Sequence, residues 1–280
     1  MNLILNGRLK FVKQLKKLPK GEKCYNADMK IIIKNDDQIT GIRRSCRLAS
    51  QTLDYLTPHI KEGISTQEIN DLAYQFIIDH NAKPAPLFYQ GFPKSICTSL
   101  NEVVCHGIPS PKDVLKKGDI LNVDVTTILD GFYGDTSRMF LIEPVADEAR
   151  KLVVETKNAM MKAIGALSPG KYLNHCVGRV IENYVEQFGY ASVRSLTGHG
   201  VGLEFHEDPA VFHFNLGFDD VLLKPGMILT VEPMINASDN YQVKTDPNDG
   251  WTVRTVDGAL SAQWEHTVLI TPDGYEILTK

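Results

Sequence analysis

Apolar residues recur every three or four positions between residues 39 and 56, and this spacing predicts an amphipathic helix. The helix is expected to begin at the capping run 35–37 (Asn-Asp-Asp) and to end near Gly63. The run Ser-Thr-Gln-Glu at 65–68 has the pattern of a capping box and predicts a second helix. Strands are then expected in the apolar runs 102–105 and 119–127, between turns rich in Gly and Pro.

The second half of the chain repeats this order. A helix is expected from about Asp147 to Leu167, and another follows that Asn174 would cap. Segments 115–124 and 223–232 read LKKGDILNVD and LKPGMILTVE, an offset of 223 − 115 = 108. The helix-ending glycines 63 and 170 are offset by 170 − 63 = 107. We interpret this agreement as a duplication; the other interpretation is chance similarity between two strands introduced by Lys-x-Gly turns.

Duplicated halves that share one centre predict a single α/β (α+β) domain over residues 31–280, after a short extension over 1–30. If the halves are related by a pseudo-twofold axis, Asp124 and Glu232 occupy equivalent strand ends and can face one another.

The composition is that of a globular protein, with 43% hydrophobic and 23% charged residues. A net charge of −4 gives no bias toward DNA, and no apolar run approaches the roughly 18 residues of a membrane span. Five scattered cysteines indicate free thiols in a reducing compartment. With no export signal in the sequence, we expect a cytoplasmic protein.

The extension over residues 1–30 is basic. Arg8 and the lysines at 10, 13, 16, 17, 20 and 23 face a single acid, Glu22, within the first 23 residues. Because ribosomal RNA is polyanionic, one hypothesis is that the extension aids ribosome docking. The other interpretation is a solvated tail.

Acidic residues on apolar strands are the first chemical signal. Asp124 lies in the run Ile-Leu-Asn-Val-Asp-Val, and burying an ionised carboxylate there is costly unless it is paired or binds a metal. Asp135 follows 11 residues later, beyond a turn at 129–131, so a hairpin would bring the two acids side by side. Two adjacent carboxylates share a proton or a cation.

Glu232 and Glu265 repeat this anomaly, and His199 lies in a Gly-His-Gly run that permits a close backbone approach. A single acid on a strand is more often salt-bridged, but four carboxylates with one imidazole suit Mn, Fe(II), Co or Zn and suffice for two divalent ions. His106 and His206 each precede a turn, and either is structural or catalytic on this pattern alone. The histidines at 59, 80, 175, 213 and 266 are expected to be structural or at the surface.

These residues lie in strings that resemble the type I methionine aminopeptidases of bacteria. The strings include NEVVCHGIP at 101–109, DILNVDV at 119–125, GDTS at 134–137, GHG at 198–200, FHE at 205–207, TVEP at 230–233 and QWEHT at 263–267. The resemblance covers residues 29–280 in unbroken order. It implies the pita-bread fold, in which two α/β halves surround a dinuclear metal site.

The resemblance also implies the activity, which is removal of the initiator methionine from nascent chains when the next residue is small. Asp124 would chelate one metal, His199 and Glu232 the other, and Asp135 and Glu265 both. A metal-bridging hydroxide would attack the scissile carbonyl. The catalytic side chains would be His206 at the carbonyl oxygen, His106 at the scissile nitrogen and Glu232 as the proton shuttle.

By the same resemblance, the methionine pocket would be lined by Tyr89, Phe92, Cys97, Phe205 and Trp251. This sequence departs from the common bacterial pattern at the pocket, with Pro86 for a frequent Cys, Phe88 for Gly and Phe92 for Tyr. A structural Na or K ion on backbone carbonyls would match Asn101, Val103 and Ser261.

Three alternatives compete with this interpretation. X-Pro peptidases share the ligand set but carry a further N-terminal domain, for which about 30 residues are too few. Type II methionine aminopeptidases carry a long insertion between the ligands His199 and Glu232, which here are separated by only 232 − 199 = 33 positions. Non-catalytic relatives have generally lost metal ligands. We therefore expect an active type I enzyme, and a monomer.

Overall fold

The computed structural model describes residues 29–280, so most of the basic extension expected over 1–30 lies outside the described residues. The elements of the first half are α2 (Asp36–Leu56), α3 (Thr66–Asp79), β1 (Lys83–Pro84), the short 3₁₀ helix η1 (Tyr89–Gly91), β2 (Cys97–Leu100), β3 (Val103–Cys105), β4 (Ile120–Leu129) and β5 (Phe132–Leu141). Those of the second half are α4 (Asp147–Ala166), α5 (Leu173–Cys176), α6 (Gly178–Val185), η2 (Glu186–Phe188), β6 (Ala191–Ser192), β7 (Gly198–Gly200), β8 (Glu207–Val211), β9 (Ile228–Val231), β10 (Met234–Asn236), β11 (Val243–Thr245), β12 (Val253–Thr255), β13 (Ser261–Gln263), β14 (His266–Thr271) and β15 (Gly274–Ile277).

Helix α2 begins where the sequence predicts and ends earlier. The side chain of Asn35 accepts the backbone N–H of Gln38, and the side-chain oxygen of Gln38 accepts the backbone N–H of Asn35, which completes a capping box. The last helical residue is Leu56, so the expected end near Gly63 is wrong. Pro58 explains the difference, because proline has no N–H and its ring clashes with the carbonyl four residues before it.

The predicted repeat is present in the hydrogen bonds. The amide of Gly63 donates to the carbonyl of Leu115, and the amide of Gly170 donates to that of Leu223, both at 2.9 Å. The turn glycines of the two LKxG segments also bond alike: Gly118 donates to Ile142 at 2.8 Å and Gly226 to Ile270 at 2.9 Å. The two segments therefore occupy equivalent positions in two similar halves.

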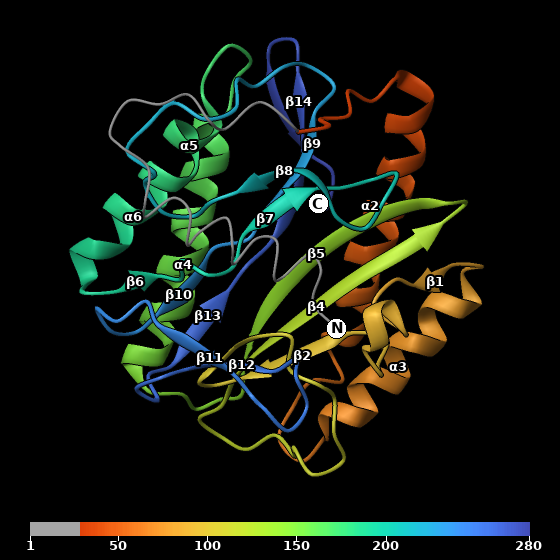
Figure 1. Cartoon of the computed structure of the whole chain (residues 1–280). Helices are drawn as coiled ribbons and strands as arrows, with labels where there is room; N and C mark the ends of the chain where they lie inside the picture. The colour runs from red at the N-terminus through yellow and green to blue at the C-terminus, as the bar shows by residue number, and fades with distance from the viewer. Residues whose placement is uncertain (1–28) are drawn as a thin grey trace.

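The helices of the two halves lie on opposite flanks, with strands between them (Figure 1). One core packs α2 and α3 against β4, through residues such as Leu53, Ile69 and Val123. A second core packs α4 and α6 against the strands of the second half. Each half therefore has its own apolar core. The strand ends of the two halves face one another in the region between these cores.

Four sheets lie between the helices in the part of the chain that the structure describes. The first contains β1, β4 and β2 in that order, with β5 paired to β4, and the largest has the order β15-β14-β9-β7-β8. Two three-stranded sheets have the orders β13-β10-β6 and β11-β12-β3. A bridge between Ser137 of β5 and Glu265 joins the two halves, and the hydroxyl of Thr136 donates to the carbonyl of Glu265 at 2.7 Å.

The second helix of the second half differs from its prediction. It is broken at Val177 into α5 and α6, and Asn174 lies inside α5 instead of capping it. The Asn174 amide group instead donates to Phe214 and accepts from Leu216. The carboxylate of Asp220 accepts the backbone N–H of Asn174 at 2.9 Å, so an acid from a later loop satisfies the helix start.

Two broader expectations concern cysteines and membranes. Cys46, Cys97, Cys105 and Cys176 are free thiols and all four are buried. Within residues 29–280, no helix combines the length and the apolar character that crossing a lipid bilayer requires.

Candidate metal centre

Two carboxylates of the first half project from one face of the β4–β5 hairpin. In the register, Asp124 is opposite Ser137 and Asp135 is opposite Thr126, so the two acids are diagonal neighbours on the same face. The hydroxyl of Thr126 donates to Asp135 at 2.7 Å. The hairpin inferred from their spacing is therefore correct.

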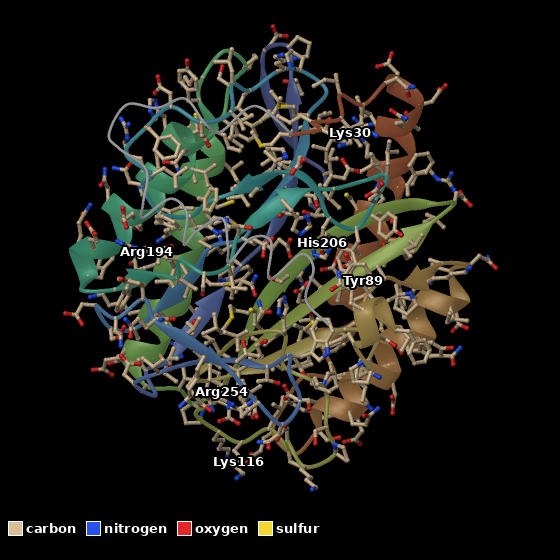
Figure 2. The ribbon with its side chains drawn as sticks, viewed as in Figure 1. Lys30, Tyr89, Lys116, Arg194, His206 and Arg254 are labelled. Atoms are coloured by element: carbon tan, nitrogen blue, oxygen red, sulfur yellow. The ribbon has the colours of Figure 1, made fainter. Side chains whose placement is uncertain are left out.

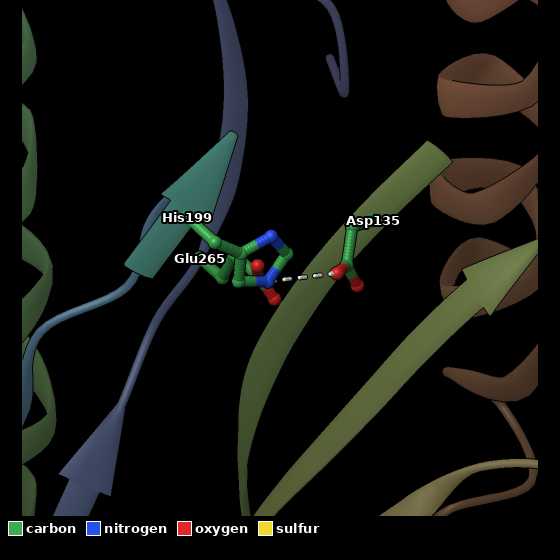
Figure 3. A group of neighbouring side chains, drawn as sticks. All are labelled: Asp135, His199 and Glu265. Atoms are coloured by element: carbon green, nitrogen blue, oxygen red, sulfur yellow. Dashed lines mark ion pairs between the residues drawn. The ribbon is translucent and has the colours of Figure 1, made fainter. Parts of the chain in front are cut away.

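His199 enters from the second half on β7. Its neighbour Gly200 has to be glycine, because a Cβ there would lie 2.4 Å from the carbonyl oxygen of Asp208. The ring Nδ1 lies 2.9 Å from the carbonyl oxygen of Gly200 and donates to it, which leaves the other ring nitrogen, Nε2, facing the acids. Nε2 lies 3.6 Å from Asp135 (Figure 3). It also lies 3.6 Å from Glu232.

Glu232 is held by three neighbours that the sequence did not single out. Thr230 donates to Oε1 at 2.8 Å and Gln263 donates to Oε2 at 3.1 Å. Its own N–H donates to Nε2 of His213 at 3.1 Å. These contacts fix the carboxylate beside His199, because each of its oxygens accepts a hydrogen bond.

Single ligand atoms of Asp135, His199 and Glu265 all lie within 4.8 Å of one another, and Asp124 and Glu232 line the same pocket. Burial and then the charges of Asp135 and Glu232 raise the pKa of Asp124, and burial followed by neighbouring acids raises that of Glu265. Burial raises the pKa of Asp135 to about 7.

Within residues 29–280, no lysine or arginine forms an ion pair with Asp124, Asp135 or Glu265. Crowded buried carboxylates without a lysine or arginine partner fit divalent cations, whose charge would offset both the burial and the mutual repulsion of the acids. Carboxylate oxygens with one imidazole nitrogen suit first-row divalent metals.

An aromatic pocket adjoins the acids. Its lining includes every residue that the resemblance placed in the site: Tyr89, Phe92, Cys97, His106, Asp124, Asp135, His199, Phe205, His206, Glu232, Trp251 and Glu265. Of the departures from the bacterial pattern, Pro86 and Phe92 line the pocket, whereas Phe88 is 77% exposed outside it.

Two further histidines face this pocket. The Nδ1 atom of His206 lies 3.0 Å from the hydroxyl of Tyr89, and the two side chains lie near the middle of the molecule (Figure 2). His106 follows β3, with its ring 6.3 Å from that of Trp251. Burial lowers the pKa of His106 to about 4, so its ring is neutral at pH 7.

Sequence reasoning assigned no site to His213, which is fully buried behind Glu232. Burial and then the charge of His199 lower its pKa to about 3, so its neutral Nε2 can accept the Glu232 amide. The signal was available, because His213 is a polar residue in the apolar run 211–214. The other unassigned histidines lie elsewhere: His175 pairs with Asp219, and His266 bonds to Thr279.

Of the three residues expected at the alkali-ion site (Asn101, Val103 and Ser261), Asn101 and Ser261 are joined by a backbone hydrogen bond. The amide of Ser261 donates to the carbonyl of Asn101 at 2.9 Å, and Val103 begins β3 two residues later. That carbonyl therefore already accepts one hydrogen bond.

Known proteins resemble this chain along most of its length. Metallopeptidase family M24 matches residues 40–272. A methionine aminopeptidase of Rickettsia prowazekii is 50% identical over 251 residues, which cover 90% of this chain and 96% of that protein. The crystal structure of methionine aminopeptidase from Rickettsia prowazekii has a TM-score of 0.86 at 49% identity and covers 90% of this chain and 100% of that one.

A more distant likeness concerns the X-Pro alternative. The prolidase from Pyrococcus furiosus has a TM-score of 0.70 at 24% identity, and the match covers 89% of this chain but 65% of that one. That likeness is one of fold alone.

Proposed function

The chain belongs to metallopeptidase family M24, as a methionine aminopeptidase with the pita-bread fold, and from this premise we propose how its own residues perform the reaction. The enzyme removes the initiator methionine from nascent polypeptides whose second residue is small. The main support for the residue assignment is that ligand atoms of Asp135, from the first half, and of His199 and Glu265, from the second half, lie within 4.8 Å of one another.

The five donors form the metal centre of this proposal. Asp124 would hold one divalent ion, His199 and Glu232 would hold the other, and Asp135 and Glu265 would serve both. Co, Mn, Fe(II) and Zn all suit this donor set. When bound, the ions supply a Lewis acid for the scissile carbonyl and a water of lowered pKa as nucleophile. The chain's part is to hold four carboxylates together that would otherwise repel one another.

The aromatic pocket binds the methionine side chain. Phe92 and Trp251 pack edge to face with their ring centroids 5.3 Å apart, and the rings of Tyr89 and Phe205 are 4.8 Å apart. A flexible thioether makes favourable contacts with aromatic edges, which suits these walls to methionine. Cys97 closes the pocket on the side of β2.

His206 stabilises charge at the scissile carbonyl oxygen. With the hydroxyl of Tyr89 as donor to Nδ1, the ring proton is on Nε2, which can donate to the oxygen as negative charge develops. His106 is neutral at pH 7 and contacts the scissile nitrogen without adding a charge. The two histidines thus serve opposite ends of the bond that breaks.

Glu232 moves the proton to the leaving amine. Its oxygens already accept from Thr230 and Gln263, so the carboxylate is held in one orientation beside His199. A positioned carboxylate can take a proton from the nucleophile and return it to the nitrogen.

The remaining assignments concern partners and compartment. We propose a cytoplasmic monomer that meets nascent N-termini at the ribosome, where the basic extension adds salt-sensitive attraction. An Na or K ion near Asn101 and Ser261 would steady the junction of β3 and β13.

The test is peptide cleavage after metal removal and re-addition, with Met-Ala-Ser, an Ala-Pro peptide and a Leu-leading peptide. Release of methionine that depends on metal, with no release from the others, supports the proposal. Preference for the X-Pro bond would move the activity to the prolidase branch. A folded protein that cleaves none of the peptides with any metal would be a binding protein.

A further inference from the structure

A buried ion pair lies behind the loop that carries Phe205 and His206. Lys34, just before α2, pairs with Glu207, the first residue of β8, and both side chains are 1% exposed. Neither residue lines the pocket. The pair therefore lies outside both the metal donors and the pocket walls.

The carboxylate of Glu207 binds the backbone of the loop. Its Oε1 accepts the amide of Leu203 at 2.7 Å and that of Glu204 at 3.1 Å, and its Oε2 accepts the ammonium of Lys34. One side chain thus closes the segment 203–207 into a ring. Phe205 and His206 are the two residues of that ring whose side chains reach the pocket.

Lys34 is itself fixed in place. Its amide donates to the carbonyl of Gly226 at 2.9 Å, and four residues earlier the amide of Lys30 donates to the carboxylate of Asp208 at 3.0 Å. Burial lowers the pKa of Lys34, while the hydrogen bond and charge of Glu207 oppose that change.

An ion pair is a costly way to join two segments, because apolar side chains of similar volume often serve packing as well or better. What an apolar side chain cannot do is accept two backbone amides. One oxygen of the carboxylate accepts both amides when the side chain is held in one rotamer, and Lys34 supplies the opposite charge that a buried carboxylate requires.

Resting on the proposed function, we propose that Lys34 and Glu207 are positioning residues for the reaction. Through the amides of Leu203 and Glu204 they fix the loop, and through the loop they set Phe205 in the methionine pocket and His206 at the carbonyl.

Three variants and one control test this role in the metal-loaded full chain. Glu207→Ala removes the acceptor, Glu207→Gln keeps an oxygen for the two amides, and Lys34→Met removes only the ammonium. Asp208→Ala is the control, because it removes the side-chain hydrogen bond to Lys30 of the same N-terminal segment and leaves the hydrogen bonds of Glu207 in place. The measurements are kcat and KM for Met-Ala-Ser, metal content, and hydrogen exchange of the amides of Leu203 and Glu204.

Glu207→Ala should lower kcat/KM about 100-fold, the scale of a reacting group displaced by about 1 Å. The effect should appear in both constants, since His206 acts on kcat and Phe205 on KM, with metal content unchanged and faster exchange at both amides. Glu207→Gln should stay within about tenfold of the parent, and Lys34→Met should lie between the two. Asp208→Ala should leave kcat, KM and both amides unaltered.

Two results would overturn the proposal. One is a Glu207→Ala variant with the kcat and KM of the unsubstituted protein. The other is an Asp208→Ala variant whose kcat/KM falls as much as that of Glu207→Ala, because the ion pair would then only hold the N-terminal segment in place. If Glu207→Ala does not fold, the test rests on Lys34→Met. Parental kcat and KM in that variant, with parental hydrogen exchange at the amides of Leu203 and Glu204, would reject the positioning role. The unsubstituted protein is assayed first. If it releases no methionine with any metal, the proposed function itself is rejected, and this outcome is separate from the positioning role.

Discussion

The hydroxyl of Tyr89 and the Nδ1 atom of His206 lie 3.0 Å apart and join residues 117 positions apart in the sequence. Tyr89 thus has two contacts at once, since its ring also packs 4.8 Å from that of Phe205 in the pocket wall. Tyr89 therefore orients His206, which stabilises charge in the proposed reaction, and also forms part of the wall that binds the methionine side chain.

Replacing Tyr89 by Phe should separate these two effects. The ring remains, so KM for Met-Ala-Ser should change less than twofold, while loss of the hydrogen bond that orients His206 should lower kcat about tenfold, or about 1.4 kcal/mol. Tyr133→Phe is the matched control, because its ring stacks on Phe205 at 6.0 Å. An effect on KM alone would show that Tyr89 only lines the pocket.

Asp135→Asn should abolish metal retention without unfolding the protein. The carboxylate is buried in a preformed hairpin, where an amide of the same shape can still accept from Thr126 but binds a cation weakly. Methionine release should fall at least 1000-fold. Metal content, circular dichroism and activity are the measurements, with Asp130→Asn at the exposed hairpin tip as control. Full activity at normal metal content would contradict a bridging role.

His199→Ala and His206→Ala should differ, although the two rings lie only 4.4 Å apart. His206→Ala should lower kcat by about 100- to 1000-fold at nearly parental metal affinity, because its proposed partner is charge in the transition state. His199→Ala should weaken metal binding first. Metal titration followed by kinetics at saturating metal distinguishes weaker metal binding from slower turnover. If both variants lose metal affinity to the same extent, His206 is a metal ligand.

Asp220 should make stability depend on pH. Burial raises its pKa to about 6, so the folded state binds its proton more tightly than the unfolded state does. The contribution of Asp220 to the unfolding free energy is therefore greatest below about pH 4, falls as the pH rises to about 6 and remains lower above it. The size of this decrease is on the order of 2–3 kcal/mol.

Asp220→Asn should remove that decrease, since the amide oxygen can still accept the Asn174 N–H. Urea unfolding at pH 4 should match the parent, and at pH 7 the variant should be more stable by about 2–3 kcal/mol. Asp273→Asn, at an exposed acid in the turn before β15, is the control. A variant that is less stable than the parent at pH 7 would show that the charged form is the favoured one.

Deleting residues 1–28 should weaken co-sedimentation with ribosomes at low salt and leave cleavage of Met-Ala-Ser unchanged. Seven basic residues in this segment would release counterions from RNA, so the difference should disappear as salt is raised. A full-length variant with these residues changed to Gln should behave like the deletion. Unchanged co-sedimentation at low salt would reject the docking role.

The features that the sequence predicted best are those that depend on neighbours along the chain. The LKxG repeat, the helix cap at Asn35, the capping box at Ser65 and the β4–β5 hairpin follow from local patterns, and each is present. Acids on apolar strands also singled out Asp124, Asp135, Glu232 and Glu265, which line one pocket, because a buried charge is anomalous wherever its partner lies.

What the sequence could not predict depends on distant partners. Lys34 lies in the polar run Lys-Asn-Asp-Asp, which is typical of a solvated helix start, yet its partner Glu207 is 173 positions away. Asn174 has the side chain of a capping residue, but Asp220 takes that role. In both cases tertiary contacts outweigh a local preference of at most about 1–2 kcal/mol.

The bridge between Ser137 and Glu265 brings candidate donors of both halves to one place. Asp124 and Asp135 come from one half of the chain, and His199, Glu232 and Glu265 come from the other. Neither half by itself carries the whole donor set. A substitution that separates the halves at this bridge, without changing any donor, should therefore weaken metal binding as a lost ligand would.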